Sequence, residues 1–185
     1  MKNNKGFSLI ELSIVLIILG ILVAGVTGGS SLIKSAQIRA TCEDFANYKN
    51  AYNAYYEQFG KRAGTQEENY HDAFLEMQEK GIITQKIDGG YKVESKLRDN
   101  YFMFSGINNE SEKYIFDMDD VLLKLLNPDG DKSLSAKDAK SILKKIDDGK
   151  GNSGFVIAVN TENDEIADVD VTNGDNYMII MRMDF

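Results

Sequence analysis

The fold of this chain is decided by the stretch Gly6-Phe7-Ser8-Leu9-Ile10-Glu11-Leu12, residues 6–12. It follows a short basic head and opens an apolar run whose one charged residue is Glu11. From Leu12 to Ile33 no ionisable side chain occurs, and these 22 residues would span roughly 33 Å as a helix, about the hydrocarbon thickness of a bilayer. A carboxylate at such a place costs on the order of 3 kcal/mol in lipid, so Glu11 indicates a function.

The stretch at residues 6–12, with the junction between Gly6 and Phe7, resembles the N-terminus of type IV pilins and of the pseudopilins of type II secretion. The resemblance rests on Gly6, on the aromatic Phe7 and on Glu11, the fifth residue of a chain that begins at Phe7. It implies that a prepilin peptidase cuts after Gly6 and methylates the new amino terminus. It also implies that Glu11 pairs with the terminal amine of Phe7 on a neighbouring subunit. Two charges in an apolar filament core are tolerable as such a pair.

Two other interpretations of the same segment stay open. A secretory signal peptide also has a basic head and an apolar core, and the small residues around Ala24 and Gly25 could mimic a cleavage site. An ordinary membrane anchor fits the length of the run. Neither of them accounts for Glu11 or for the Gly6-Phe7 junction, so we favour the pilin-like interpretation.

The charge balance narrows the function classes. Lysine and arginine number 21 against 29 aspartate and glutamate residues, a net charge of −8, which becomes −10 once Lys2 and Lys5 leave with the leader. This acidity argues against nucleic-acid binding, which requires neutralised phosphates. The two leader lysines favour a cytoplasmic N-terminus and a periplasmic bulk. Cys42 is the one cysteine, so no intrachain disulfide can form, whereas many pilins have one.

No enzymatic role is expected. The sequence shows no Walker loop, dinucleotide fingerprint, Ser–His–Asp set or zinc cluster. The sole histidine, His71, lies in a polar stretch without the neighbours that a general base needs.

The expected fold class is α+β, with a long N-terminal helix on a small antiparallel sheet. Past the apolar run, an apolar stripe at spacings of three and four continues the helix: Ile38, Cys42, Phe45, Tyr48, Tyr52, Tyr55 and Phe59. A short helix is predicted around 70–80, and strands at 87–93 (a hairpin), 101–104, 113–116, 154–159, 165–171 and 177–183, with Asn173-Gly174 as a hairpin turn. We divide the chain into a leader (1–6), a transmembrane or filament-core helix (7–33) and a head (34–185).

An acidic loop interrupts the predicted sheet. Oxygen-bearing side chains occupy positions 1, 3, 5, 9 and 12 of a twelve-residue loop: Asn127, Asp129, Asp131, Ser135 and Asp138. Ser133, at position 7, would offer its backbone carbonyl. This spacing resembles an EF-hand loop of the dockerin variety and predicts calcium, which takes six to eight oxygen ligands. Helices at 119–126 and 136–146 would complete a helix–loop–helix within 119–147.

Two departures weaken the calcium prediction. Asn127 replaces the usual first aspartate, and Lys132 stands where glycine usually makes the turn. The alternative is an acidic turn that caps the next helix, with Ser135 as N-cap and Asp138 as its capping partner. A second acidic group, Asp164, Asp168, Asp170 and Asp175, reads as the solvent face of a strand more than as an ion site.

Together these features predict a structural filament subunit. It would be anchored in the bacterial inner membrane, processed by the prepilin peptidase, passed to the inner-membrane assembly platform and packed with other subunits, its head stabilised by calcium. The alternative from a different class is a membrane-anchored, calcium-dependent protein-binding module that forms no filaments. The sequence does not distinguish a secretion pseudopilus from a surface pilus or a DNA-uptake filament.

Overall fold

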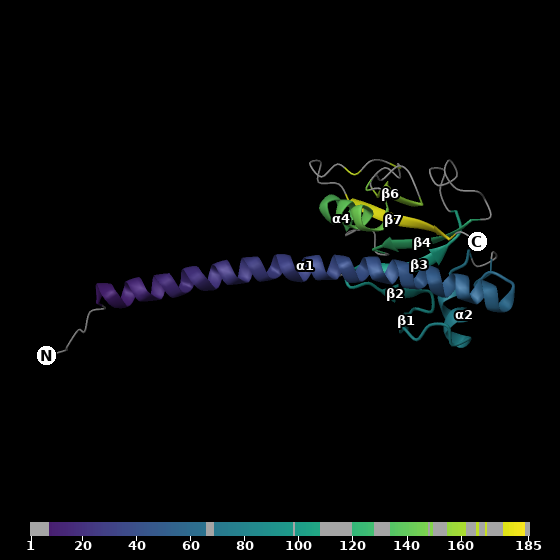
Figure 1. The fold of residues 1–185 in the computed structure, drawn as a ribbon, viewed down its shortest axis with the longest axis horizontal. Helices are drawn as coiled ribbons and strands as arrows, with labels where there is room; N and C mark the ends of the chain where they lie inside the picture. The colour runs from purple at the N-terminus through teal and green to yellow at the C-terminus, as the bar shows by residue number, and fades with distance from the viewer. Residues whose placement is uncertain are drawn as a thin grey trace. The chain divides into compact units, whose positions relative to one another are not determined.

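The computed structural model describes residues 8–65, 69–97, 99–107, 120–127, 134–147, 149, 155–161, 166, 169 and 176–183 of the 185-residue chain. Its elements, drawn in Figure 1, are α1 (Leu9–Phe59), α2 (Ala73–Glu79), β1 (Ile87–Asp88), β2 (Lys92–Glu94), β3 (Tyr101–Ser105), β4 (Val121–Leu126), β5 (Leu134–Ser135), α4 (Ala136–Ile146), β6 (Val156–Asn160) and β7 (Asn176–Met183). The predicted α+β class is confirmed: a long N-terminal helix packs on an antiparallel sheet.

The chain divides into two compact units, Met1–Ala36 and Gln37–Phe185. The first unit consists, in its described part, of the first half of α1. The second unit, which we call the head, contains the second half of α1 and all other elements.

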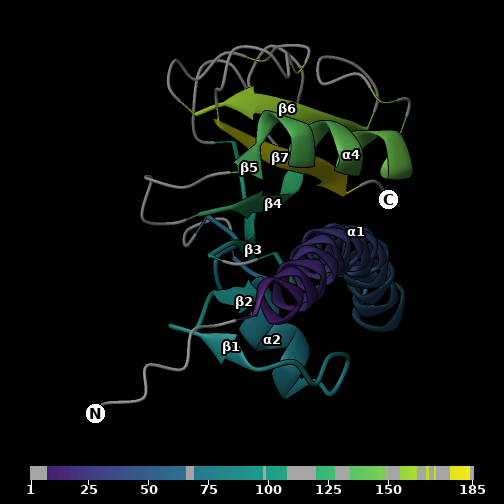
Figure 2. The same ribbon diagram turned by 90° about the vertical axis from the view of Figure 1, so that its left-hand side faces the viewer.

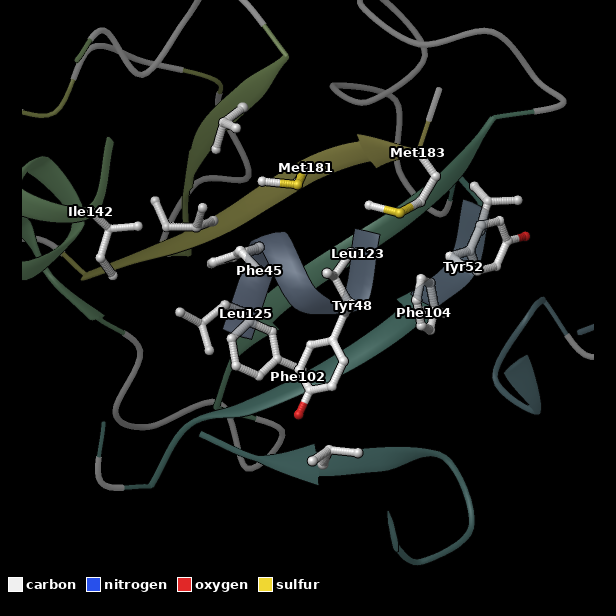
Figure 3. Packing of buried hydrophobic residues seen from close by; sticks show 14 of the residues in the cluster. Phe45, Tyr48, Tyr52, Phe102, Phe104, Leu123, Leu125, Ile142, Met181 and Met183 are labelled. Atoms are coloured by element: carbon white, nitrogen blue, oxygen red, sulfur yellow. The ribbon is translucent and has the colours of Figure 1, made fainter. Parts of the chain in front are cut away.

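The second half of α1 buries one apolar stripe in the head. Its buried residues are Ile38, Thr41, Phe45, Tyr48, Tyr52 and Tyr55, which recur every three or four positions as the sequence predicts. Of the two other predicted stripe residues, Cys42 is half-buried and Phe59 is exposed. Stripe and sheet meet through aromatic rings (Figure 3). Phe45 lies edge-on to Phe102 of β3, with 4.9 Å between ring centroids, and Tyr52 stacks on Phe104 at 5.0 Å.

Across the sheet the strands run in the order β1, β2, β3, β4 and β7, and Figure 2 shows this order with β6 beyond β7. Tyr177 of β7 pairs with Leu134 of β5 and with Asn160 of β6, so β5 and β6 lie on opposite edges of β7. Since β4 and β6 both pair with residues 179–181, they too lie on opposite edges. It follows that β4 and β5 share one edge of β7. The chain leaves this edge after Leu126 and rejoins it at Leu134.

Both faces of the sheet are covered. Val121, Leu123 and Leu125 of β4 join the main core with α1 and α4. Their neighbour Leu122 faces the other way, into a smaller cluster with Ile157, Val159 and Ile180.

The helix predicted over 119–126 is wrong, because residues Val121–Leu126 form the strand β4. The run Val-Leu-Leu-Lys-Leu-Leu is apolar at five of its six positions and does not alternate, which fits a strand buried on both faces as well as a helix. Here β3 and β7 offer hydrogen-bonding partners on both edges, and five of the six residues are buried. The acidic loop is therefore followed by the predicted helix, α4, but preceded by a strand.

The other predictions divide as follows. The hairpin of β1 and β2 and the strands β3, β6 and β7 are confirmed, and the helix around 70–80 is α2. The strand at 113–116 and the Asn173-Gly174 turn lie outside the described residues, and of 165–171 only Ile166, bridged to Val159, and the buried Val169 are described.

Candidate assembly site and acidic loop

The first half of α1 exposes its apolar side chains. Fifteen large apolar residues from Leu9 to Ile33 are exposed, among them Leu9 at 84 % and Leu32 at 74 %. In the described residues α1 is the one helix long and apolar enough to cross a membrane, with a mean hydropathy of 2.8 over its best 18-residue window. Such a surface is stable only against lipid or against other apolar helices.

Three hydroxyl groups in this half bond to the backbone of the helix itself. The Ser13 hydroxyl donates to the carbonyl of Ile10 at 2.8 Å, and the Ser30 hydroxyl donates to the carbonyl of Thr27 at 2.9 Å. The Thr27 hydroxyl bonds back in the same way, to Ala24 at 3.0 Å. Hydroxyls that bond to the preceding turn expose no unpaired donor to lipid.

Glu11 binds the start of its own helix. Its Oε2 accepts a hydrogen bond from the backbone N–H of Ser8 at 2.8 Å, which is one half of a capping box. The sequence analysis missed this bond, although the spacing Ser8-x-x-Glu11 is the signal for it. The two predicted processing residues, Gly6 and Phe7, of which Phe7 is also the predicted assembly partner of Glu11, lie outside the described residues.

At the acidic loop, the structure describes three of the six predicted calcium ligands. Asn127 and Asp138 are buried, and Ser135 is the N-cap of α4. The Ser135 hydroxyl donates to Oδ2 of Asp138 at 2.8 Å and accepts from the Asp138 N–H at 3.3 Å. The capping pair of the alternative interpretation is therefore confirmed. Asp129, Asp131 and Ser133 lie outside the described residues, as do Asp164, Asp168, Asp170 and Asp175.

The structure shows the environment of Cys42 and of His71, the sole cysteine and the sole histidine of the sequence. Cys42 is half-buried, and burial raises the pKa of its thiol, which keeps it protonated. His71 is half-buried with its ring 5.8 Å from that of Tyr91.

A charged cluster that the sequence did not reveal joins α1 to α2. Glu76 of α2 accepts hydrogen bonds from the Tyr55 hydroxyl at 2.5 Å, from the Lys61 ammonium at 2.5 Å and from the Gly64 N–H at 2.7 Å. Burial acts to raise the pKa of Glu76, but the bonds from Lys61, Tyr55 and Gly64 outweigh it and lower that pKa. The three donors lie 12 to 21 positions before Glu76, too far for local spacing to reveal them.

The N-terminal segment has a recognisable counterpart among known proteins. Residues 1–27 match the family described as the prokaryotic N-terminal methylation motif. No curated protein and no solved structure matches the chain significantly. The motif supports the pilin and pseudopilin family, implies processing by a prepilin peptidase and, with the exposed apolar helix, fits an inner-membrane-anchored pilin. It indicates a family of structural subunits rather than of enzymes.

Proposed function

We propose that this protein is a structural subunit of a type IV pilus or of a type II secretion pseudopilus. The observation that carries the proposal is the first half of α1, whose apolar surface from Leu9 to Ile33 is exposed and overlaps the prepilin-type motif at residues 1–27. Before assembly this surface would lie in the inner membrane with the head in the periplasm. In the filament the same surface would pack against the α1 helices of other subunits.

Glu11 would set the register of the subunits. A carboxylate has about four lone-pair sites, so the bond from Ser8 to Oε2 leaves room for the terminal ammonium of Phe7 on a neighbour. In an apolar surrounding, an unmatched carboxylate or ammonium is costly, so subunits shifted from the matched position would be disfavoured.

The first test is the intact mass and the N-terminal sequence of the protein recovered from its native bacterial membrane. A chain that begins with N-methylated Phe7 is expected. A chain that still carries Met1, or one cut near Ala24, would contradict the proposal and point to an anchor or a signal peptide.

The second test is incorporation of variants into filaments. Glu11→Ala should reduce the subunit in sheared filaments by more than about tenfold, since a lost buried partner costs several kcal/mol. Glu57→Ala is the matched control, because Glu57 is an exposed glutamate on the same helix. Equal incorporation of the two variants would favour the membrane-anchored binding module instead.

We also propose that calcium binds the acidic loop and ties down the second half of the head. In support, the ends of the loop are held together on one edge of β7, and Asn127 and Asp138 are buried at those ends. Calcium accepts monodentate carboxylates, so the bond between Ser135 and Oδ2 of Asp138 is compatible with Asp138 as a calcium ligand. Asn127, Asp129, Asp131, Ser135 and Asp138 would contribute side-chain oxygens and Ser133 its backbone carbonyl.

The melting temperature of the head tests this. With a Kd of about 10⁻⁴ M, millimolar calcium should raise the melting temperature by roughly 3–5 °C relative to a sample in the chelator EGTA. Asp131→Asn should remove the rise, while Asp99→Asn, an exposed aspartate outside the loop, should keep it. An identical melting temperature in calcium and in chelator would contradict the calcium proposal. Ser135 and Asp138 would then serve only to cap α4.

A further inference from the structure

The head contains a cavity that the filament function does not use. It has a volume of about 720 Å³ and lies between the second half of α1, β1, β2 and the start of β3. Asp44 and Tyr48 line it from α1, one turn apart, so their side chains share a face of the helix. The opposite wall includes Gln85, Ser95 and Tyr101.

Tyr48 brings an unpartnered hydroxyl to this cavity. Its side chain is 3 % exposed, and its ring packs edge-on against Phe74 and Phe102, each with 5.1 Å between centroids. Figure 3 shows its hydroxyl pointing away from Phe102 and from the labelled apolar side chains. In the described part of the chain this hydroxyl makes no hydrogen bond, so it can bond to a molecule in the cavity.

Asp44 supplies an acceptor beside this donor. It is half-buried and has neither a hydrogen bond nor an ion pair within the described residues. Burial raises the pKa of its carboxyl, and the charge of Lys96 partly offsets this. Burial, and then the charge of Asp44, also raises the pKa of Tyr48, so the phenol keeps its proton at neutral pH. The two groups thus present a carboxylate acceptor and a hydroxyl donor to one space.

The remaining side chains restrict what could fill that space. Its wall is mainly polar, which disfavours an apolar ligand. Asp88 and Glu94 add carboxylates while Lys86 and Lys96 add ammonium groups, so neither a polyanion nor a polycation matches the whole lining. Among the described residues no three His, Cys, Asp or Glu side chains converge as metal ligands do.

We propose that this cavity binds a neutral saccharide. The side chains of Tyr48, Asp44, Gln85 and Ser95 include both hydrogen-bond donors and acceptors. A sugar matches such a lining because each of its hydroxyl groups can donate and accept. The half-buried ring of Tyr101 also lines the cavity; the Lys92 ammonium lies over one face of this ring, 4.3 Å from its centroid, which leaves the other face for the C–H groups of a sugar ring. The volume suffices for a di- or trisaccharide. The cavity lies wholly within the head, so binding does not depend on filament assembly.

Titration of the full-length protein with neutral trisaccharides tests the proposal. The probes are maltotriose and triacetylchitotriose, with trilysine as the charged comparison. The protein is held in a zwitterionic detergent because sugar-headed detergents would compete. Backbone amide shifts around Asp44, Tyr48 and Gln85 should move with one of the trisaccharides, with a Kd from about 10⁻⁴ to 10⁻² M.

Two variants with a matched control locate the binding. Tyr48→Phe keeps the ring packing and should weaken binding about five- to tenfold, the effect of one lost hydrogen bond, with an unchanged melting temperature. Asp44→Asn should weaken it similarly. Tyr56→Phe, at an exposed tyrosine on the same helix, should bind as the native chain does. The proposal is overturned if neither trisaccharide binds at about 10⁻² M, if trilysine alone binds, or if Tyr48→Phe binds undiminished. Because the head can bind without assembling, these results are independent of the tests of filament formation.

Discussion

The two halves of α1 are both rich in apolar side chains, but they bury them differently. In the first half, large apolar residues from Leu9 to Ile33 occur around the whole helix and are exposed in the single chain. In the second half they are confined to one stripe, and the head covers that stripe with rings from β3 and α2. One continuous helix thus packs its apolar side chains against its own head from residue 37 onward and leaves those before it exposed.

The comparison predicts that equivalent truncations in the two halves have unequal effects on the head. Phe45→Ala should lower the free energy of unfolding of the head by about 3–5 kcal/mol, because Phe45 is fully buried against Phe102. Leu16→Ala should leave it within about 0.5 kcal/mol, because Leu16 is 61 % exposed. Denaturant unfolding of both variants in the same detergent is the measurement. Equal losses would mean that the first half contributes to head stability.

A second prediction contrasts two glutamates at opposite ends of α1. Glu76 of α2 bonds to residues near the C-terminal end of α1, whereas Glu11 lies in the first turn of α1. Glu76→Gln should destabilise the head by about 1–2 kcal/mol at pH 7, because it weakens the bonds from Tyr55, Lys61 and Gly64. Glu11→Gln should leave the head unchanged and affect assembly alone. Glu79→Gln, at an exposed glutamate of α2, is the control and should be neutral within about 0.5 kcal/mol.

The effect of Glu76→Gln should depend on pH in a defined direction. The folded pKa of Glu76 is lowered, so its contribution is fully present above the unfolded pKa and is lost as pH falls through the folded pKa. The gap between native and Glu76→Gln melting temperatures should therefore narrow in acid. A gap that widened below about pH 4 would show that Glu76 is not stabilised as a carboxylate.

The smallest expected effect concerns backbone freedom. Ala46→Gly, at an exposed position of the second half, should lower head stability by about 0.5–1 kcal/mol, since glycine loses more entropy when the helix forms. Ala24→Gly makes the same change in the first half and should leave the thermal melt of the head unaltered. A loss caused by Ala24→Gly would contradict the separation of the two units.

Local sequence patterns were sufficient to predict features that depend on the residues of a single helix. The uncharged run after Glu11 predicted the first half of α1, and the three-and-four spacing from Ile38 to Tyr55 predicted the buried stripe of the second half. The Ser135 and Asp138 spacing predicted the helix cap as one alternative, and the cap is present. In each case the physical cause lies within one helix, so neighbouring residues reveal it.

By itself, then, the sequence determined an apolar helix with a prepilin-type start, an amphipathic continuation and an α+β head. Tertiary structure alone decided that 121–126 is a strand, because an apolar run without a period takes its form from the edges that β3 and β7 offer. It alone placed β5 on the same edge of β7 as β4, gathered three donors around Glu76 and brought Gln85, Ser95 and Tyr101 to one cavity with Asp44 and Tyr48. These features join residues far apart in the chain, and their partners are set by packing rather than by spacing.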